Sequence, residues 1–235
     1  MNKYKIAGLV VEMQPNFELL IERSKNYITD TSALADIKIC VREDDVSEMQ
    51  KLNPHLSLEE CEYLLFGHDF YSKLPDFDAV LLHSSCVAVD GYAYLFSAPC
   101  GTGKSTHTTL WKKHFGDRLT FVNDDKPALR IIDGKVYACG TPFSGKTSLN
   151  TDVCVPVKGI CILSRDTYNH IHKMEASQAI PKIMNQTFRP QNRLQMLKVL
   201  EILDTILSNV GVYSLHCNME DDAVITSYNG MNGIN

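Results

Sequence analysis

Residues 98–105, with the sequence APCGTGKS, constrain the fold of this chain more than any other stretch does. The stretch fits the P-loop pattern, in which a small residue opens the loop and Gly-Lys-Ser or Gly-Lys-Thr closes it. The apolar run 92–97 before it is typical of a buried strand, and residues 106–115 can continue as a helix because they contain no glycine or proline. A strand, a glycine-rich turn and a helix start form the context that this motif requires. The stretch therefore predicts a nucleotide-binding site.

The residue types in this loop explain how it would hold phosphate. Gly101 and Gly103 allow the backbone to curl, so that successive N–H groups point at phosphate oxygens, and the helix start adds its positive end. Lys104 is long enough to reach the β- and γ-phosphates, and the Ser105 hydroxyl can ligate Mg²⁺. The alternative is a glycine-rich turn with no ligand. The expected nucleotide contacts in the loop are Pro99, Cys100, Gly101, Thr102, Gly103, Lys104, Ser105 and Thr106.

Composition and charge exclude several classes of protein. The chain has 235 residues, of which 44% are hydrophobic, enough for one large or two small domains. Its net charge of −5 argues against nucleic acid as the main partner. The N-terminus lacks the apolar run of a signal peptide, and no stretch has the length of a membrane span. We therefore expect a cytoplasmic protein that does not bind membranes.

The cysteine pattern gives a further expectation. The eight cysteines are scattered singly without a C-x-x-C pair, which indicates neither a zinc knuckle nor a redox motif. Cys40, Cys86, Cys139 and Cys161 lie in strand-like runs, where cysteine packs as a small apolar residue. We expect a reduced protein without structural disulfides. Cys100 is the exception, because its place in the glycine-rich loop makes it accessible.

The order of strands and turns predicts an α/β fold with a mixed, partly antiparallel sheet. The dipeptides Asp90-Gly91 and Asp133-Gly134 each separate two apolar runs, which is a strong hairpin signal. Hairpins therefore stand on both sides of the glycine-rich loop, whereas a doubly wound fold alternates strand and helix. Helices are expected at 58–66, 176–187 and 190–209. In the last helix, five leucines at helical spacing are expected to pack in the core: Leu194, Leu197, Leu200, Leu203 and Leu207.

Three segments are expected along the chain. Residues 1–76 would form a small N-terminal α+β lobe packed on the core, because no linker rich in proline, glycine or serine follows them. Within this lobe, 42–56 is a polar stretch, and Ser57 with a glutamate three residues later forms a capping box that begins a helix. Residues 77–228 would form the P-loop kinase-like core, and 229–235 a frayed tail.

Two adjacent carboxylates, Asp124 and Asp125, follow an apolar strand about twenty residues after Lys104. In P-loop enzymes a carboxylate at a strand end holds Mg²⁺, and a second one can take a proton from an attacking hydroxyl. Their side chains point to opposite faces of an extended segment, so the two roles can divide. The sequence does not say which aspartate has which role. The alternative is a solvated turn, because Asn-Asp-Asp also favours turns.

The run from residue 81 to residue 149 resembles the HPr kinase/phosphorylase family and its relatives among the P-loop proteins related to phosphoenolpyruvate carboxykinase. The whole chain resembles small bacterial HPr-kinase-like proteins. The resemblance implies that His83 lies near the phosphates, and that one aspartate of the pair lies near metal while the other acts as a base. The N-terminal residues do not resemble the regulatory domain of the full-length kinases, and the acceptor is left open. The resemblance depends on His83 with Val87 to Gly91, the loop 98–105, Asn123 to Asp125, and Gly140 to Pro142.

Three further cations are candidates for phosphate contacts. Lys146 lies in a glycine-containing loop that could reach phosphate, although a solvated surface lysine is the alternative. Arg189 and Arg193 flank Pro190 at a helix start, and either could serve as an arginine finger, with surface pairing as the alternative.

Together these features predict an ATP- and Mg²⁺-dependent kinase that transfers the γ-phosphoryl group to a hydroxyl. The acceptor would be a serine in a small protein or peptide, or a small metabolite. Catalysis would rest on Lys104, His83, Asp124 and Asp125, with Mg²⁺ held by Ser105 and the aspartates. The alternative is a non-catalytic nucleotide-binding protein that serves regulation or assembly. The oligomeric state is left open, with a homo-oligomer as one alternative.

Overall fold

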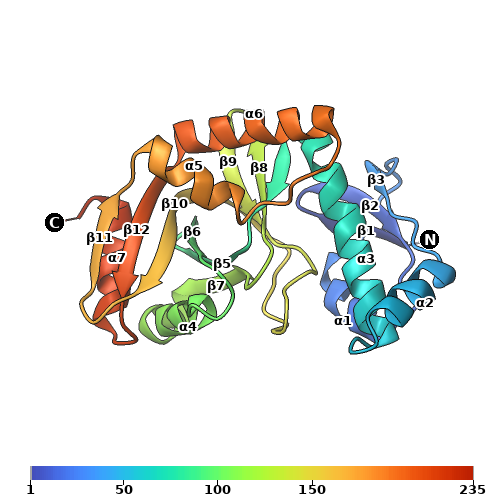
Figure 1. Ribbon diagram of the computed structural model, residues 1–235, viewed down its shortest axis with the longest axis horizontal. Helices are drawn as coiled ribbons and strands as arrows, with labels where there is room; N and C mark the ends of the chain where they lie inside the picture. Colours follow the sequence, from blue (N-terminus) through green and yellow to red (C-terminus); the bar gives the residue numbers. More distant parts are fainter. Residues whose placement is uncertain (1, 235) are drawn as a thin grey trace.

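The computed structural model describes residues 2–234 and contains two β-sheets surrounded by helices (Figure 1). The N-terminal sheet has the order β1-β2-β3 and lies beside three helices. Its elements are β1 (Asn2–Ile6), β2 (Leu9–Met13), α1 (Glu18–Ser24), the 3₁₀ turn Lys25–Tyr27, β3 (Ile37–Lys38), α2 (Glu43–Leu52) and α3 (Leu58–Lys73). The 3₁₀ turn Leu74–Phe77 leads from α3 into the larger sheet.

The larger sheet is mixed, which confirms the predicted partly antiparallel α/β architecture. Its strands lie in the order β4-β8-β9-β10-β6-β5-β7, with β12 beside β10 and β11 beside β12. The long strand β10 is antiparallel to β9 in its first residues and parallel to β6 and β12 in its later ones. The strands are β4 (Ala79–Leu81), β5 (Ser84–Val89), β6 (Tyr92–Ser97), β7 (Leu119–Asn123), β8 (Ala128–Ile132), β9 (Lys135–Cys139), β10 (Cys154–Arg165), β11 (His170–Lys173) and β12 (Gly211–Cys217).

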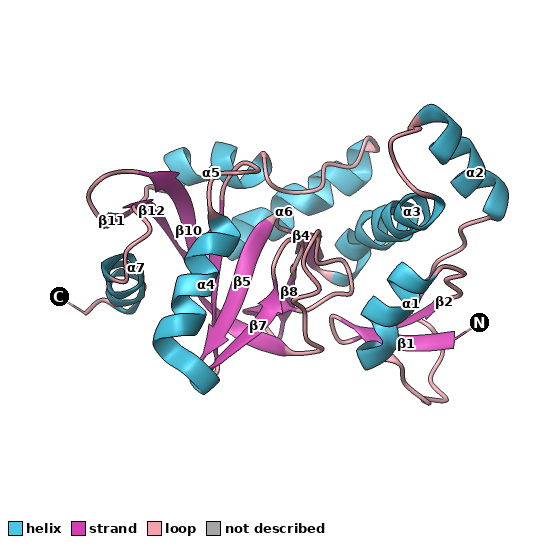
Figure 2. Ribbon diagram, turned by 90° about the horizontal axis from the view of Figure 1, so that it is seen from below, coloured by secondary structure: helices cyan, strands magenta, loops and turns pink. Residues whose placement is uncertain are grey.

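Helices cover both faces of this sheet. On one face, α5 (Ala176–Met184) and α6 (Arg193–Asn209) bury Ile183, Val199 and Ile206 against the strands. On the other, α4 (Lys104–Phe115) and α7 (Asp222–Asn232) bury Trp111 and Val224 (Figure 2). The 3₁₀ turn Gly116–Arg118 joins α4 to β7. Within residues 2–234, none of the helices combines the length and apolar character that crossing a bilayer requires.

Both predicted hairpins are confirmed. Strands β5 and β6 pair antiparallel around Asp90-Gly91, and β8 and β9 do so around Asp133-Gly134. The aspartates have φ values of 51° and 48°, and the glycines 82° and 73°. Two consecutive positive φ angles match the twist of the flanking strands, and Asp-Gly tolerates them best.

The N-terminal helices extend further than the sequence indicated. The capping box is confirmed, because the Glu60 backbone N–H donates to Ser57 Oγ at 3.2 Å and the Ser57 N–H donates to the Glu60 carboxylate at 2.8 Å. Helix α3 then continues to Lys73 instead of ending near residue 66. The polar stretch also contains the ten-residue helix α2, which buries a single residue, Val46, and therefore has no apolar periodicity.

One hydrophobic cluster joins the N-terminal elements to the larger sheet. It contains Phe66 and Phe70 of α3 together with Leu81, Ala128 and Phe143, which belong to or follow the strands of the larger sheet. The N-terminal elements are therefore packed against the sheet through continuous apolar contacts. The boundary at residue 76 stays a prediction.

The expected leucine stripe of α6 is confirmed only in part: Leu203 is buried and Leu207 packs against the core, whereas the other three leucines are exposed. Leu194, Leu197 and Leu200 have 72%, 46% and 42% of their surface exposed. Instead, the face of α6 toward the sheet consists of Val199, Ile202, Leu203 and Ile206. The leucine spacing of three drifts around a helix of 3.6 residues per turn, so that Val199, Ile202 and Ile206 occupy the core side beside Leu203.

The expected frayed tail is also wrong for the residues that the structure describes; Asn235 lies outside them. Helix α7 runs to Asn232 and buries Met231. A side chain at position 230 would collide with Ile171 of β11. Gly230 therefore marks a close approach between helix and strand, although its sequence context, Asn-Gly-Met-Asn-Gly, is typical of turns.

A disulfide contradicts the expectation of a chain without structural disulfides. Cys139 ends β9 and Cys154 begins β10, and the two residues are direct partners across the antiparallel pair, with Cα atoms 4.1 Å apart. No local sequence pattern indicated this bond, because the two cysteines are brought together only by strand pairing. The bond closes the loop of residues 140–153, named the 140–153 loop below.

We expect Cys154→Ser to lower the free energy of unfolding by about 3 kcal/mol, since the bond closes a span of 15 residues. Urea unfolding of the oxidised protein measures this, and adding dithiothreitol should reduce the wild type to the level of the variant. Cys40→Ser, which removes an exposed free thiol, serves as the control. Equal stabilities of wild type and Cys154→Ser would contradict the prediction.

Candidate functional site

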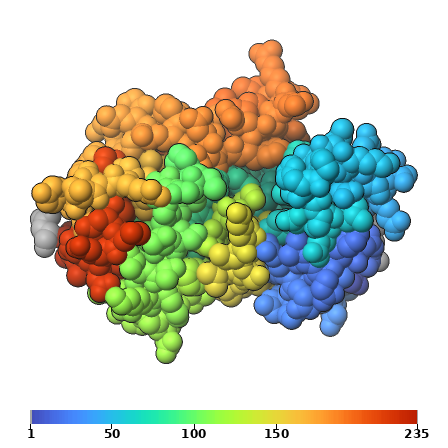
Figure 3. Space-filling view, turned by 60° about the horizontal axis from the view of Figure 1, so that its bottom comes forward, coloured from blue at the N-terminus to red at the C-terminus, as the bar shows by residue number. Residues whose placement is uncertain are grey.

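Five segments that lie far apart in the sequence meet around one cavity of about 450 Å³, named the glycine-loop cavity here. The space-filling view shows the 140–153 loop, in yellow, between the residues of the α4 region and the N-terminal residues (Figure 3). The cavity is lined by His83, Cys100, Gly101, Gly103, Lys104, Ser105, Thr106, Asp124, Asp125, Ser144, Gly145, Lys146, Thr147 and Arg165. Of the site residues expected from the sequence, those that do not line it are Pro99, Thr102 and the two arginine candidates, Arg189 and Arg193.

The glycine-rich loop, residues 98–105, has an open backbone. Gly101 and Gly103 have φ values of 77° and 121°, and a Cβ at either position would have no atom within 4 Å. Helix α4 begins at Lys104 with no side chain capping its N-terminus and no acidic residue in its first turn. Unsatisfied N–H groups at a helix start attract anions. This loop therefore fits a phosphate group.

Lys104 lies at the base of the loop and is 8% exposed. Its ammonium group donates to the Ala98 and Pro99 carbonyl oxygens at 2.8 and 3.4 Å. Burial lowers the pKa of Lys104, and the carboxylate of Asp125 acts in the opposite direction. Thr102 Oγ1 also donates to the Pro99 carbonyl, at 2.8 Å. Pro99 and Thr102 thus help to fix the conformation of the loop without lining the cavity.

Arg165 is a site residue that the sequence did not reveal. Its guanidinium Nε donates to the Thr102 carbonyl at 2.9 Å, and Nη2 donates to the Gly101 carbonyl. Arg165 ends β10, which runs parallel to the strand β6 before the glycine-rich loop. Carboxyl ends of parallel strands meet at one edge, so knowledge of this pairing would have indicated Arg165. Arg189 and Arg193, the expected arginine candidates, are exposed and do not line the cavity.

Asp124 is buried and surrounded by hydroxyl groups. One carboxylate oxygen accepts from Ser85 Oγ, and the other accepts from Thr147 Oγ1 at 3.0 Å. Ser85 Oγ in turn lies 2.8 Å from Thr108 Oγ1, which donates to the Ser105 carbonyl at 3.2 Å. The hydroxyl groups of Ser85 and Thr108 therefore lie between Asp124 and the first turns of α4. Oxygen donors at this place suit Mg²⁺.

Asp125 has cationic and imidazole partners instead. Its carboxylate lies 2.8 Å from Lys126 Nζ and 3.2 Å from His83 Nε2. Burial alone would raise the pKa of Asp125, but the His83 hydrogen bond and the Lys126 charge lower it to about 2. His83 Nδ1 lies 2.7 Å from the Gln186 side-chain oxygen, and the His83 backbone N–H donates to the Gln186 carbonyl at 2.7 Å. Gln186, another residue that the sequence did not reveal, thus orients the imidazole.

N-terminal residues hold the loop that carries Lys146. The Gly145 N–H donates to the Tyr63 hydroxyl at 3.1 Å, and Arg23 Nη1 donates to the Gly145 carbonyl at 2.6 Å. The Tyr27 hydroxyl donates to Asn150 Oδ1 at 2.9 Å. Lys146 itself is exposed and lines the cavity. The N-terminal elements therefore contribute to the site by fixing the 140–153 loop.

A separate group of Asp166, His170 and His216 has ligand atoms within 4.8 Å of one another. The His170 and His216 rings are stacked with an interplanar angle of 5°, so their in-plane nitrogen lone pairs do not converge. Both nitrogens of His216 already lie near serine hydroxyls, those of Ser164 and Ser214. We assign no metal to this group.

Comparisons with known proteins add a distant likeness. No family model and no curated protein sequence matches this chain. A solved structure of the HPr(Ser) kinase/phosphatase from Coxiella burnetii aligns with a TM-score of 0.38 and 10% sequence identity. The alignment covers 65% of this chain and 95% of that chain. Likeness at this level is a distant structural relationship and assigns no role to any residue here.

The environment of Asp125 predicts a pH-dependent stability. Its pKa falls from 3.8 in the unfolded chain to about 2 in the folded protein, so its stabilisation is complete above about pH 4 and is lost as the pH falls toward 2. Asp125→Asn should therefore cost about 2 kcal/mol near neutral pH, and the difference should shrink at pH 3. Urea unfolding of both proteins at pH 7 and pH 3 measures this. A difference that does not depend on pH would contradict it.

Proposed function

We propose that this protein is an ATP- and Mg²⁺-dependent kinase that transfers the γ-phosphoryl group to a hydroxyl acceptor. The observation that supports this most is the meeting of the glycine-rich loop, Lys104 and two carboxylates around one cavity. Phosphoryl transfer requires hydrogen-bond donors positioned around the phosphates, a metal ligand and a group that accepts a proton, and little other chemistry from the protein.

The glycine-rich loop and Lys104 would bind the β- and γ-phosphates, with Arg165 holding the loop carbonyls in place. Ser105 and Asp124 would hold Mg²⁺, which neutralises the negative charge that develops on the phosphates. Asp124 fits this role because its carboxylate is connected through Ser85 and Thr108 to the backbone of Ser105. Lys146, which lines the cavity from the 140–153 loop, would supply a further cation.

Asp125 would receive the acceptor proton. The acceptor oxygen forms a bond to the γ-phosphorus, the bond from that phosphorus to the bridging oxygen of ADP breaks, and the hydroxyl proton passes to the carboxylate. With a pKa of about 2, Asp125 is ionised at neutral pH and can accept a hydrogen bond from the hydroxyl. His83, held by Gln186, and Lys126 would keep this carboxylate oriented as positioning residues.

The alternative is a nucleotide-binding protein without transferase activity. Binding alone requires the glycine-rich loop, Lys104 and a metal ligand. It does not require a second ionised carboxylate positioned by an imidazole and an ammonium group. The Asp125 arrangement is therefore the reason to prefer the kinase.

We expect Lys104→Ala to weaken MgATP binding by about 1.5–3 kcal/mol, which is the range for a hydrogen bond to a charged group. Isothermal titration calorimetry measures this affinity. Lys113→Ala, which removes an exposed lysine of the same helix, is the matched control and should bind MgATP normally. Unchanged affinity in a folded Lys104→Ala protein would contradict nucleotide binding at this loop.

We expect the two aspartate variants to fail differently. Asp125→Asn should keep MgATP affinity and slow transfer by roughly 10²- to 10⁴-fold, the usual range for losing a general base. Asp124→Asn should instead raise the Mg²⁺ concentration required for activity. Transfer from γ-labelled ATP is measured over a Mg²⁺ titration, with Asp117→Asn, an exposed carboxylate, as control. If both variants keep wild-type rates and Mg²⁺ dependence, the binding-protein alternative is preferred.

A further inference from the structure

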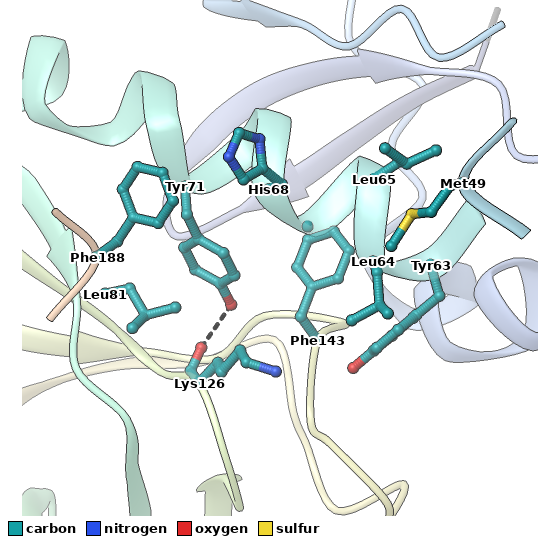
Figure 4. Close-up of a pocket in the computed structure, with 11 residues that line it drawn as sticks. Met49, Tyr63, Leu64, Leu65, His68, Tyr71, Leu81, Lys126, Phe143 and Phe188 are labelled. Atoms are coloured by element: carbon teal, nitrogen blue, oxygen red, sulfur yellow. Dashed lines mark hydrogen bonds between the residues drawn. The ribbon is translucent and has the colours of Figure 1, made fainter. Parts of the chain in front are cut away.

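A second cavity of about 460 Å³ lies between helix α3 and the larger sheet (Figure 4). In the close-up, the side chains of Tyr71, Phe143 and Phe188 surround one space, with Lys126 at its edge. Among the described residues that line this cavity, Lys126 is the one that carries a full positive charge. The lining consists of Met49, Tyr63, Leu64, Leu65, Gly67, His68, Tyr71, Leu81, Lys126, Phe143 and Phe188.

This apolar cavity and the glycine-loop cavity share a wall. Lys126 lines the apolar cavity, and its ammonium group is 2.8 Å from the carboxylate of Asp125, which lines the other one. Tyr63 lines the apolar cavity, and its hydroxyl accepts from the N–H of Gly145 in the other cavity. Phe143 and Ser144 are consecutive residues that face one cavity each.

We propose that the apolar cavity binds the body of the phosphoryl acceptor, and that this acceptor is a small hydroxyl compound with an aromatic or branched aliphatic group. This inference rests on the kinase function proposed above and narrows its substrate class. The hydroxyl would be directed toward Lys126 and Asp125 at the shared wall, while the apolar group contacts the aromatic and leucine side chains.

The chemistry of the lining supports this class of ligand. A cavity of this volume lined by aromatic and aliphatic side chains, with few polar groups at one end, is typical of small-molecule sites. A wholly polar acceptor such as free serine would gain little from these side chains, because they offer few hydrogen-bond partners. The Tyr71 hydroxyl is already satisfied by the Lys126 carbonyl at 2.6 Å and lies 2.9 Å from Thr141 Oγ1. It is therefore fixed as part of the wall.

The position of the cavity also distinguishes it from a packing defect in the hydrophobic core. Leu64 and His68 on α3 are exposed to solvent at its margin, so a ligand can enter from outside. At the other end, Lys126 connects the cavity to the carboxylate that would take the acceptor proton. A ligand that spans this distance would have its apolar part in the cavity and its hydroxyl at the reacting end.

The test compares two acceptors that differ only in a phenyl ring, L-serine methyl ester and L-serine benzyl ester, the latter called the ester below. Transfer from γ-labelled ATP is measured with the wild-type chain of 235 residues and two variants. Leu64→Trp fills the cavity, whereas Leu58→Trp places the same side chain elsewhere on α3. The two leucines are matched, with 37% and 40% of their surface exposed. Binding of the ester and of MgATP is measured separately by calorimetry.

We expect kcat/KM for the ester to exceed that for the methyl ester by about 10- to 150-fold, since a buried phenyl ring contributes that much. Leu64→Trp should reduce this ratio toward one, and Leu58→Trp should keep it. Equal values for the two acceptors, or a ratio that survives Leu64→Trp, would overturn the inference and leave the kinase intact. A serine-containing peptide is assayed in the same way, and a higher kcat/KM for it than for the ester would overturn the inference in favour of a macromolecular acceptor.

The binding measurements distinguish the two proposals. If wild-type protein does not bind MgATP, the kinase function fails, and the substrate class fails with it. If MgATP binds and neither acceptor is phosphorylated, saturable binding of the ester that Leu64→Trp weakens still supports the ligand class of the cavity. If the ester does not bind in that case, the inference is overturned.

Discussion

The pairing of β10 with three neighbouring strands is the constraint on which the candidate site depends. Its parallel pairing with β6 brings Arg165 to the carbonyls of the glycine-rich loop. Its antiparallel pairing with β9, linked by the disulfide, closes the 140–153 loop that faces the same cavity. Two walls of the site are thus fixed by opposite halves of one strand. A shift in the register of β10 would displace both walls together.

The N-terminal elements act on the site through the same loop. The Tyr63 hydroxyl accepts from the Gly145 N–H, and the Arg23 guanidinium donates to the Gly145 carbonyl. The Tyr27 hydroxyl donates to the Asn150 side chain. The Arg23 guanidinium also lies over the Tyr63 ring, 4.8 Å from its centre, which stiffens this contact. Because the apolar cavity lies between α3 and the larger sheet, these elements form one of its walls as well. The N-terminal elements therefore line the apolar cavity and hold in place one wall of the glycine-loop cavity.

The features of the fold that could be predicted from the sequence are those that depend on interactions between residues close together in the chain. Asp90-Gly91 and the capping box of α3 follow from backbone and hydrogen-bond preferences within a few residues, and both were found. The disulfide and Arg165 depend on which strands pair, and the exposed side of α6 depends on what packs against it. Nothing in the local sequence encodes those contacts. For the site, the glycine-rich loop and the aspartates could be named, but the partners that distinguish Asp124 from Asp125 could not.

Those partners give the two adjacent carboxylates different electrostatic environments. Asp124 accepts from the neutral hydroxyls of Ser85 and Thr147 and forms no ion pair within residues 2–234, and it shares the nearby charge of Lys104 with Asp125. The charge of Asp125 is already balanced in part by Lys126. A divalent cation near Asp125 would be repelled by that ammonium group, whereas near Asp124 it would meet a buried, unbalanced carboxylate. This asymmetry is our reason for assigning the metal to Asp124 and the proton to Asp125.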